Sequence, residues 1–222
     1  IVSDTSKKLN QERKAIKSLL DIKVDAILVA PEGYESSHLI DVINSGTDIV
    51  SFGVHFENDE ISEVSIDEIT GAAKAGAYLK SVGIRDVVMM MGNPRKFTTR
   101  GRMEGFMRGF GHVPEDRVIY CEVDWKASCA TVSEMQKLPQ AFFCYNDMMA
   151  LGVMKALEER GIELGSEVKV IGYDDVYMAE IAGITTLRIP IRSMVKEAFK
   201  TILGDEVRKM VFTPEFIRRK SA

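Results

Sequence analysis

Amide and carboxylate side chains follow two short apolar segments in the second half of the chain. Asn146 comes after the aromatic segment 141–145, and Asp174 and Asp175 come after the segment 169–171. Such short apolar segments are typical of buried strands, and ligands of open α/β sheets bind beyond the carboxyl ends of parallel strands. Carboxylates accept hydrogen bonds from hydroxyl groups, and an amide both donates and accepts them. The sequence therefore predicts a site for a small polar ligand at these strand ends.

Each of these polar residues also has a purely structural explanation. Asn146 stands where a helix would be capped, ahead of apolar residues with helical spacing. Asp174 fits the pattern of a turn aspartate, and we expect Asp147 and Asp175 to hold the backbone rather than a ligand. A cap and a ligand contact are compatible roles for one amide. Asn146 and Asp174 are therefore the strongest candidates for contact with a ligand.

The same residues carry a resemblance to a known family. The block Asn-Asp-x-Met-Ala-Leu-Gly at 146–152 and the block Val-Ile-Gly-Tyr-Asp-Asp at 170–175 resemble the effector-binding core of the LacI/GalR transcription regulators. This pair of blocks is fairly specific. Further pieces agree with the family in the right order, although each is weak alone, namely segments 24–29, 102–106, 184–190 and 216–221.

Strands and helices alternate along the chain, which predicts an α/β fold with parallel sheets covered on both faces. The resemblance implies a two-lobed periplasmic-binding-protein-like fold, in which each lobe is a parallel sheet flanked by helices. We expect the first βα unit of the N-terminal lobe to be absent. The predicted N-terminal lobe is 1–66 plus 190–213, and the C-terminal lobe is 67–189 plus 214–222. Within the latter lobe, the pattern predicts a strand over 118–123, a helix over 126–138 and a last strand over 216–220.

Composition argues against several classes of protein. The net charge of −4 disfavours DNA binding by this portion, because contact with DNA phosphates needs a basic surface. The longest apolar stretch is too short to cross a bilayer. Three widely spaced cysteines and three scattered histidines argue against a disulfide framework or a metal site. We therefore expect a cytoplasmic protein without a metal. No dinucleotide, phosphate-loop or nucleophile-elbow motif occurs, so we expect neither an enzyme nor a cofactor.

Four further residues are candidates for ligand contact. The position of Arg102 in the family's Arg-x-x-Gly-Phe pattern implies that its planar guanidinium donates paired hydrogen bonds to a ligand, although a solvated helix arginine is the simpler explanation from sequence alone. Trp125 is the only tryptophan and can stack on a sugar ring or fill the core. Thr98 can face the ligand or cap a helix. Glu32 follows a core strand and can reach the cleft or lie on the surface.

The resemblance implies the effector-sensing and dimerisation domain of a LacI/GalR-type transcription regulator. A small polar effector, a sugar, would bind in the cleft between the lobes and change DNA binding by a helix-turn-helix head that this sequence does not contain. The expected partners are that effector, a second copy in a homodimer, and DNA only through the missing head, with no membrane. The alternatives are a periplasmic sugar-binding protein of a transporter and, less favoured, an α/β enzyme.

Overall fold

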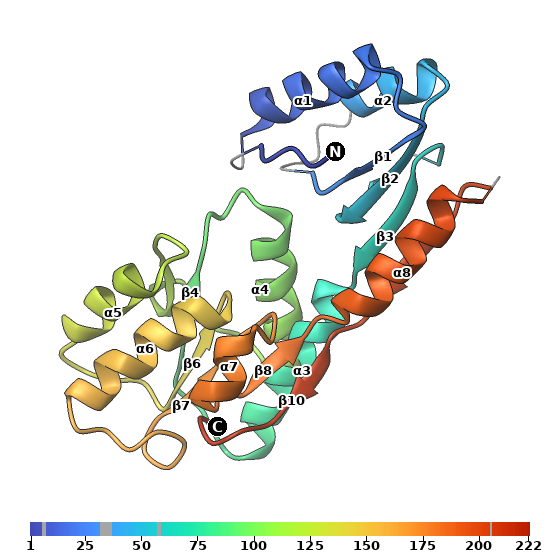
Figure 1. Ribbon diagram of the computed structural model, residues 1–222. Helices are drawn as coiled ribbons and strands as arrows, with labels where there is room; N and C mark the ends of the chain where they lie inside the picture. Colours follow the sequence, from blue (N-terminus) through green and yellow to red (C-terminus); the bar gives the residue numbers. More distant parts are fainter. Residues whose placement is uncertain (6–7, 32–36, 57–58, 205) are drawn as a thin grey trace. The chain divides into compact units, whose positions relative to one another are not determined.

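The structure is a computed structural model that describes residues 1–5, 8–31, 37–56, 59–204 and 206–222 (Figure 1). Internal contacts divide the chain into two compact units. Unit 1 consists of Ile1–Ile66 and Pro190–Phe212, and unit 2 consists of Asp67–Ile189 and Thr213–Ala222. Each unit is therefore assembled from two separate stretches of the chain.

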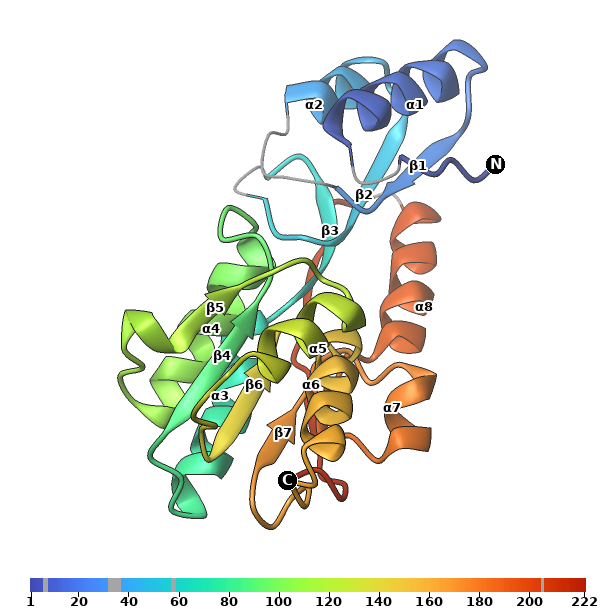
Figure 2. The same cartoon turned by 90° about the vertical axis from the view of Figure 1, so that its left-hand side faces the viewer.

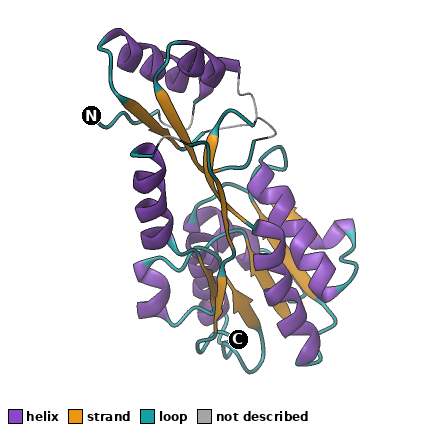
Figure 3. Ribbon diagram, turned by 90° about the vertical axis from the view of Figure 1, so that its right-hand side faces the viewer, coloured by secondary structure: helices purple, strands orange, loops and turns teal. Residues whose placement is uncertain are grey.

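Unit 1 is built on a four-stranded parallel sheet with the order β1-β2-β3-β9 (Figure 3). Helices α1 and α2 share one apolar core with β1 and β2, and α8 packs along β2 and β3. The last strand, β9, comes from the second stretch of the chain and completes the sheet beside β3. The bounds are α1 Leu9–Asp21, β1 Ala26–Val29, α2 Ser37–Asn44, β2 Asp48–Gly53, β3 Ser62–Ile66, α8 Ile191–Ile202 and β9 Lys209–Phe212.

Unit 2 contains a four-stranded parallel sheet with the order β5-β4-β6-β7 and an antiparallel pair, β8 with β10. Helices α3 and α4 pack against each other, as do α5 and α6 (Figure 2). The bounds are α3 Glu68–Ser81, β4 Val87–Met91, α4 Phe97–Phe110, η1 Glu115–Arg117, β5 Val118–Tyr120, α5 Trp125–Ser133, β6 Ala141–Cys144, α6 Asp147–Glu159, β7 Lys169–Ile171, α7 Tyr177–Ala182, β8 Thr186–Arg188 and β10 Glu215–Ile217.

The alternation of side chains along β6 explains why both faces of this sheet are covered. Phe142 and Cys144 point into the core that α6 shares, whereas Ala141 and Phe143 point into the core that α3 and α4 share. Successive residues of a strand face opposite sides of its sheet, so a strand that is apolar throughout needs cover on both sides. Cys144 is fully buried here.

The α/β class with parallel sheets flanked by helices is confirmed, while several element bounds differ from the prediction. Strand β5 stops at Tyr120, and the last strand occupies Glu215–Ile217. Helix α5 ends at Ser133 instead of residue 138. Strands β8 and β9 were not predicted, because each is short and depends on pairing with a partner distant in sequence.

Glycines allow α3 and α4 to approach closely. A methyl group added at Gly105 of α4 would lie 2.2 Å from the Ile69 carbonyl oxygen of α3, and one at Gly109 would lie 2.1 Å from the Ala73 carbonyl oxygen. Backbone carbonyls cannot move aside as flexible side chains can. The backbones of the two helices therefore meet at these glycines.

Gly105→Ala tests this close approach through the sign of its effect. In an isolated helix, alanine stabilises by about 1 kcal/mol relative to glycine. Here we expect the opposite, a loss of about 1–3 kcal/mol in the free energy of unfolding, because the methyl group overpacks the contact with Ile69. Urea denaturation followed by circular dichroism measures the difference. A stabilised Gly105→Ala variant would contradict the contact.

Candidate functional site

The parallel strands of unit 2 bring the predicted polar residues to one edge of the sheet. Strands β6 and β7 are neighbours in register, so Tyr145 and Asn146 follow β6 where Tyr173 and Asp174 follow β7. Asn146 is the N-cap of α6, and its side-chain oxygen accepts a hydrogen bond from the Met149 N–H at 3.0 Å. Its predicted cap is confirmed, and its contact with a ligand stays a prediction.

Asp174 adopts a backbone conformation that is unusual for a residue with a side chain. Its φ angle is 102°, in the region that favours glycine. The backbone is held there because the Asp174 N–H donates to the Leu187 carbonyl at 2.9 Å. The Asp174 side chain is 30% exposed. Such strained residues persist only where their surroundings hold them, and they cluster at functional sites.

A buried ion pair lies directly beside Asp174. The Arg102 guanidinium donates from Nε to Glu68 Oε2 at 3.0 Å and from Nη2 to Glu68 Oε1 at 3.1 Å. The same Nη2 lies 3.3 Å from Asp174 Oδ1, and Nη1 donates to the Tyr145 carbonyl. Both Arg102 and Glu68 are almost fully buried. Arg102 therefore links α3, α4 and the ends of two strands.

Two tyrosine rings enclose the same guanidinium. The central carbon of Arg102 lies 3.7 Å from the centre of the Tyr173 ring and 4.7 Å from that of Tyr145. A cation over an aromatic face is stabilised by the negative potential of the ring, more so when it is desolvated. The Tyr173 side chain is itself fully buried. The rings thus add to the constraints that hold Arg102 in one orientation.

Charges and burial shift the pKa values of this cluster. Burial lowers the pKa of Arg102, but the carboxylates of Glu68 and Asp174 raise it by more, so the guanidinium stays charged. Burial raises the pKa of Asp174, an effect that Arg102 opposes and Glu68 reinforces. Burial also raises the pKa of Tyr173, which keeps its hydroxyl neutral. One cation and two carboxylates therefore share this region.

The remaining predicted site residues have different surroundings. Thr98 lies in the first turn of α4, where its hydroxyl is 2.9 Å from the Tyr145 hydroxyl. It does not occupy the N-cap position, which is Lys96. Trp125 is half-buried and begins α5. Glu32 lies outside the described residues. The structure thus brings Thr98, Arg102 and Asp174 around Tyr145 and Tyr173, and the ligand role of each stays a prediction.

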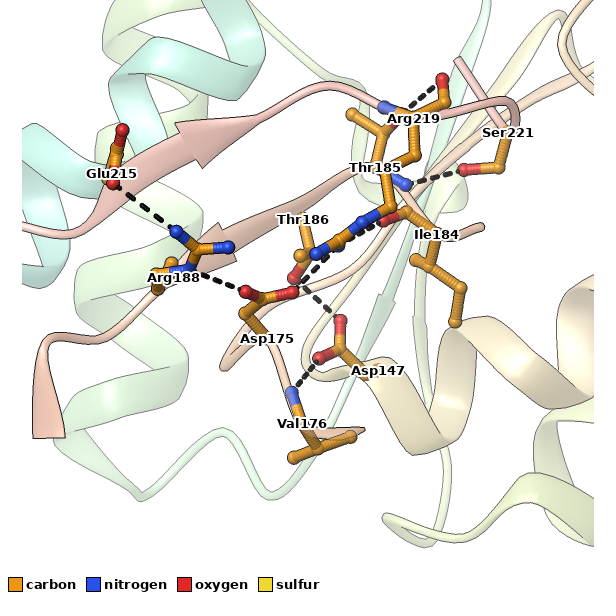
Figure 4. Close-up of polar contacts among 10 residues, drawn as sticks. All are labelled: Asp147, Asp175, Val176, Ile184, Thr185, Thr186, Arg188, Glu215, Arg219 and Ser221. Carbon is orange, nitrogen blue, oxygen red and sulfur yellow. Dashed lines mark hydrogen bonds and ion pairs between the residues drawn. The ribbon is translucent and has the colours of Figure 1, made fainter. Parts of the chain in front are cut away.

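Asp147 holds the backbone beside the site, as predicted, whereas Asp175 binds two arginine side chains (Figure 4). Asp147 is fully buried and accepts hydrogen bonds from the Thr186 hydroxyl at 2.6 Å and the Val176 N–H at 2.9 Å. Burial raises the pKa of Asp147 to about 6, although these hydrogen bonds oppose the shift. The carboxylate therefore fastens both β8 and the start of α7 to α6.

Asp175 connects the turn after β7 to β8 and to residues 213–222, the segment of the chain that returns to unit 2 (Figure 4). Its carboxylate accepts from Arg188 Nε at 2.6 Å and from Arg219 Nη1 at 2.7 Å. Burial opposes ionisation, but the two arginines hold the pKa of Asp175 below its ordinary value. The Ser221 hydroxyl donates to the Val170 carbonyl at 2.6 Å. The returning segment is thus bonded to β7 and to the turn that follows it.

Glu68 is the site residue that sequence reasoning missed. It follows Asp67, whose side chain caps α3 by accepting from the Thr70 N–H at 2.8 Å. An acidic residue in the first turn of a helix is usual, so Glu68 gave no separate signal. Its arginine partner lies 34 residues further along the chain. Only the packing of α3 against α4 reveals the pair.

The described residues add two observations on other kinds of site. They contain no group of three or more histidine, cysteine, aspartate or glutamate side chains placed to hold a metal ion. Among the helices of those same residues, none has the length and apolar character needed to cross a membrane.

Comparison with known proteins identifies the kind of molecule to which this site belongs. Residues 77–221 match the family described as a periplasmic binding protein-like domain. The chain is 29% identical over 240 residues to the HTH-type transcriptional repressor PurR of Vibrio parahaemolyticus, covering 100% of this chain and 71% of the repressor. It is 27% identical over 236 residues to the HTH-type transcriptional regulator AscG of Escherichia coli, covering 100% of this chain and 70% of AscG.

Solved structures agree with this result. The transcriptional repressor AscG of Escherichia coli matches with a TM-score of 0.86 and 25% identity, over 96% of this chain and 84% of that chain. A sugar-binding transcriptional regulator of the LacI family from Escherichia coli, complexed with phosphate, matches with the same TM-score and identity, over 96% of this chain and 82% of that chain.

The fold, the strand-end site and these relatives define a class, the effector-binding domain of LacI/GalR-type transcription regulators. The chain belongs to the periplasmic binding protein-like domain family. The resemblance inferred from the Asn-Asp and Gly-Tyr-Asp-Asp blocks is thereby confirmed. Because the relatives are transcription regulators, they also support a non-enzymatic domain over the α/β enzyme.

Proposed function

We propose that this domain binds a small polyhydroxylated effector, a sugar, at the carboxyl edge of the unit 2 sheet. Binding there modulates DNA recognition by a helix-turn-helix head outside this sequence, in a cytoplasmic homodimer. The ligand shifts the regulator between states because it interacts differently with each of them. In this proposal Asp174 and Asn146 contact the effector, with Thr98, Trp125 and Glu32 as further candidates, and Arg102 contributes to the same site.

The observation that supports this proposal best is the conformation of Asp174. Its side chain is partly exposed just after the end of β7. Its φ angle of 102° is one that residues with side chains rarely adopt in ordinary turns. A carboxylate is an acceptor for two hydroxyl protons, and a strained, supported residue at a strand end suggests a functional role. The neighbouring amide of Asn146 retains donor capacity beyond its cap.

The relatives favour a regulator over a periplasmic transport protein. PurR and AscG are both described as HTH-type transcription regulators, and one LacI-family structure of the same fold is described with bound ribose. The net charge of −4 supports a division of labour in which the head, and not this domain, contacts DNA. A regulator that reads a palindromic site needs two heads related by a two-fold axis, which supports the homodimer.

A ligand screen tests the effector class. Sugars, sugar phosphates, purines and amino acids are added separately to the domain, and its melting temperature is recorded. A ligand that binds the native state raises apparent stability, and the rise grows with the logarithm of the ligand concentration above its Kd. We expect stabilisation by at least one sugar. Stabilisation by purines or amino acids alone would reject the sugar, and sedimentation of a strict monomer would reject the dimer.

Asp174→Asn is expected to weaken binding of the sugar found in that screen by about 1.5–3 kcal/mol, the contribution of a hydrogen bond to a charged group. Asparagine tolerates the positive φ angle at this position, so the backbone should be preserved. Isothermal titration calorimetry measures the affinity. Asp175→Asn is the matched control, because its carboxylate is bonded to Arg188 and Arg219 and its loss should affect folding more than binding. Equal affinity of Asp174→Asn and the unchanged protein would remove Asp174 from the site.

A further inference from the structure

We infer that Glu68 determines the charge of the effector. By binding Arg102 through both carboxylate oxygens, it makes Arg102 a positioning residue and leaves the Asp174 carboxylate as the charged group offered to the ligand. The site then accepts neutral or cationic ligands that carry hydroxyl or amino groups, and it rejects anions such as phosphate esters and carboxylates. This inference rests on the proposed function for the position of the site, and it adds the chemical class of the ligand.

An account of the hydrogen-bond donors supports this assignment. A guanidinium has five N–H groups and no acceptor. Nε and Nη2 of Arg102 donate to Glu68, Nη2 also faces Asp174 at 3.3 Å, and Nη1 donates to the Tyr145 carbonyl. Of the five N–H groups, only one, on Nη1, has no described partner. Paired hydrogen bonds to a ligand, which the family pattern implied for Arg102, would require Glu68 to move.

The surroundings of Arg102 limit access in the same way. The rings of Tyr173 and Tyr145 lie over the guanidinium, and its side chain is only 6% exposed. The Asp174 side chain is 30% exposed, five times as much. A ligand that reaches this cluster therefore meets the carboxylate of Asp174 before it meets the guanidinium behind it.

The balance of charges around Arg102 also favours neutral or cationic ligands over anions. Glu68 and Asp174 share the single positive charge of Arg102, so the cluster carries an excess negative charge. The arginines on the neighbouring strand and returning segment, Arg188 and Arg219, are bonded to Asp175. Opposite charges at contact distance attract strongly where water is partly excluded, and like charges repel to the same degree. Hydroxyl or ammonium protons complement Asp174, whereas a phosphate would lack an unneutralised positive charge, because the charge of Arg102 is already balanced by Glu68.

Glu68→Gln tests the inference by a gain of binding. The glutamine keeps the size of the side chain but removes the charge that neutralises Arg102. We expect inorganic phosphate to bind the variant at least about tenfold more tightly than the unchanged 222-residue chain in calorimetry. Glu104→Gln is the control, because it removes the same charge from an exposed position on α4, paired with Arg108. A gain in both variants, or in neither, would overturn the assignment.

A second measurement uses the unchanged chain and holds even where Glu68→Gln fails to fold. The Nε–H of Arg102 gives its own ¹⁵N NMR signal, and we expect slow hydrogen exchange because the group is buried on Glu68. Titration with inorganic phosphate should leave this signal in place, and a phosphate-dependent shift would overturn the inference. Neither measurement uses a sugar, so a failed sugar screen would reject the proposed function without deciding the role of Glu68.

Discussion

Arg102→Met is expected to lower the free energy of unfolding by about 3–5 kcal/mol, the cost of removing one partner from a buried ion pair. Methionine fills similar space but cannot neutralise Glu68, which is 1% exposed and would keep an unpaired charge in the protein interior. The variant also loses the hydrogen bond to the Tyr145 carbonyl. Guanidinium denaturation followed by tryptophan fluorescence and circular dichroism measures the loss.

Two further variants show whether the loss comes from the unpaired charge. Arg108→Met removes an arginine from the same helix, where it is 63% exposed and paired with Glu104, and it should cost less than about 1 kcal/mol. The double variant Arg102→Met/Glu68→Met should recover much of the lost stability, because apolar replacement of a whole buried pair is often neutral. Equal losses for Arg102→Met and Arg108→Met would show that the buried pair contributes little.

Asp147 is expected to make stability fall as the pH rises from about 4 to about 6. Burial raises the pKa of Asp147 to about 6 from an ordinary value of 3.8. In that window the folded protein holds a proton that the unfolded chain has released, so folding is favoured at the acidic end. The difference corresponds to about 3 kcal/mol once Asp147 is ionised. Relative to Asp147→Asn, the unchanged protein should therefore lose stability across this window.

Asp175→Asn provides the control of opposite sign. Arg219 and Arg188 hold the pKa of Asp175 below its ordinary value, so its stabilising contribution is present at neutral pH and is lost as the pH falls through the acidic range. The contribution of Asp175 is lost only below its ordinary pKa of 3.8, so thermal unfolding of the three proteins is compared at several pH values between about 2 and 7. A flat difference between the unchanged protein and Asp147→Asn would show that Asp147 titrates with its ordinary pKa.

Sequence patterns predicted the elements whose signals are local. The apolar segments that became β6 and β7 are buried strands, and Asn146 caps the helix that follows it in the chain. The alternation of strands and helices indicated the α/β class. These features depend on a few consecutive residues, and the same consecutive residues carry the resemblance to the LacI/GalR regulators.

Features that depend on distant residues were not predicted. Strand β9 pairs Lys209 with Glu63, and its alternation of exposed and half-buried residues is a weak signal over four positions. The left-handed backbone of Asp174 follows from its hydrogen bond to Leu187 and has no marker in the Gly-Tyr-Asp-Asp block. Local patterns describe which groups a segment offers, while the partners of those groups are decided by tertiary packing.

The Glu68–Arg102 pair shows that a role inferred from a sequence pattern can depend on a partner distant in sequence. The Arg-x-x-Gly-Phe pattern around Arg102 implied a ligand contact, and nothing near it in the sequence named a competing partner. The packing of α3 on α4 through Gly105 brings Glu68 under the guanidinium. A residue carried over from a family pattern therefore needs its surroundings checked before it is given the role of a ligand contact.

The return of residues 213–222 to unit 2 constrains how the protein is made on the ribosome. Synthesis proceeds from the amino end, and domains generally fold as they emerge. Here unit 1 waits for Pro190–Phe212, and unit 2 waits for Thr213–Ala222. Until Arg219 and Ser221 have left the exit tunnel, Asp175 lacks its contact with Arg219, and the Val170 carbonyl lacks its contact with the Ser221 hydroxyl. A ribosome that stalls before residue 219 therefore holds a chain in which the contacts of Arg219 and Ser221 with the rest of unit 2 are not yet made.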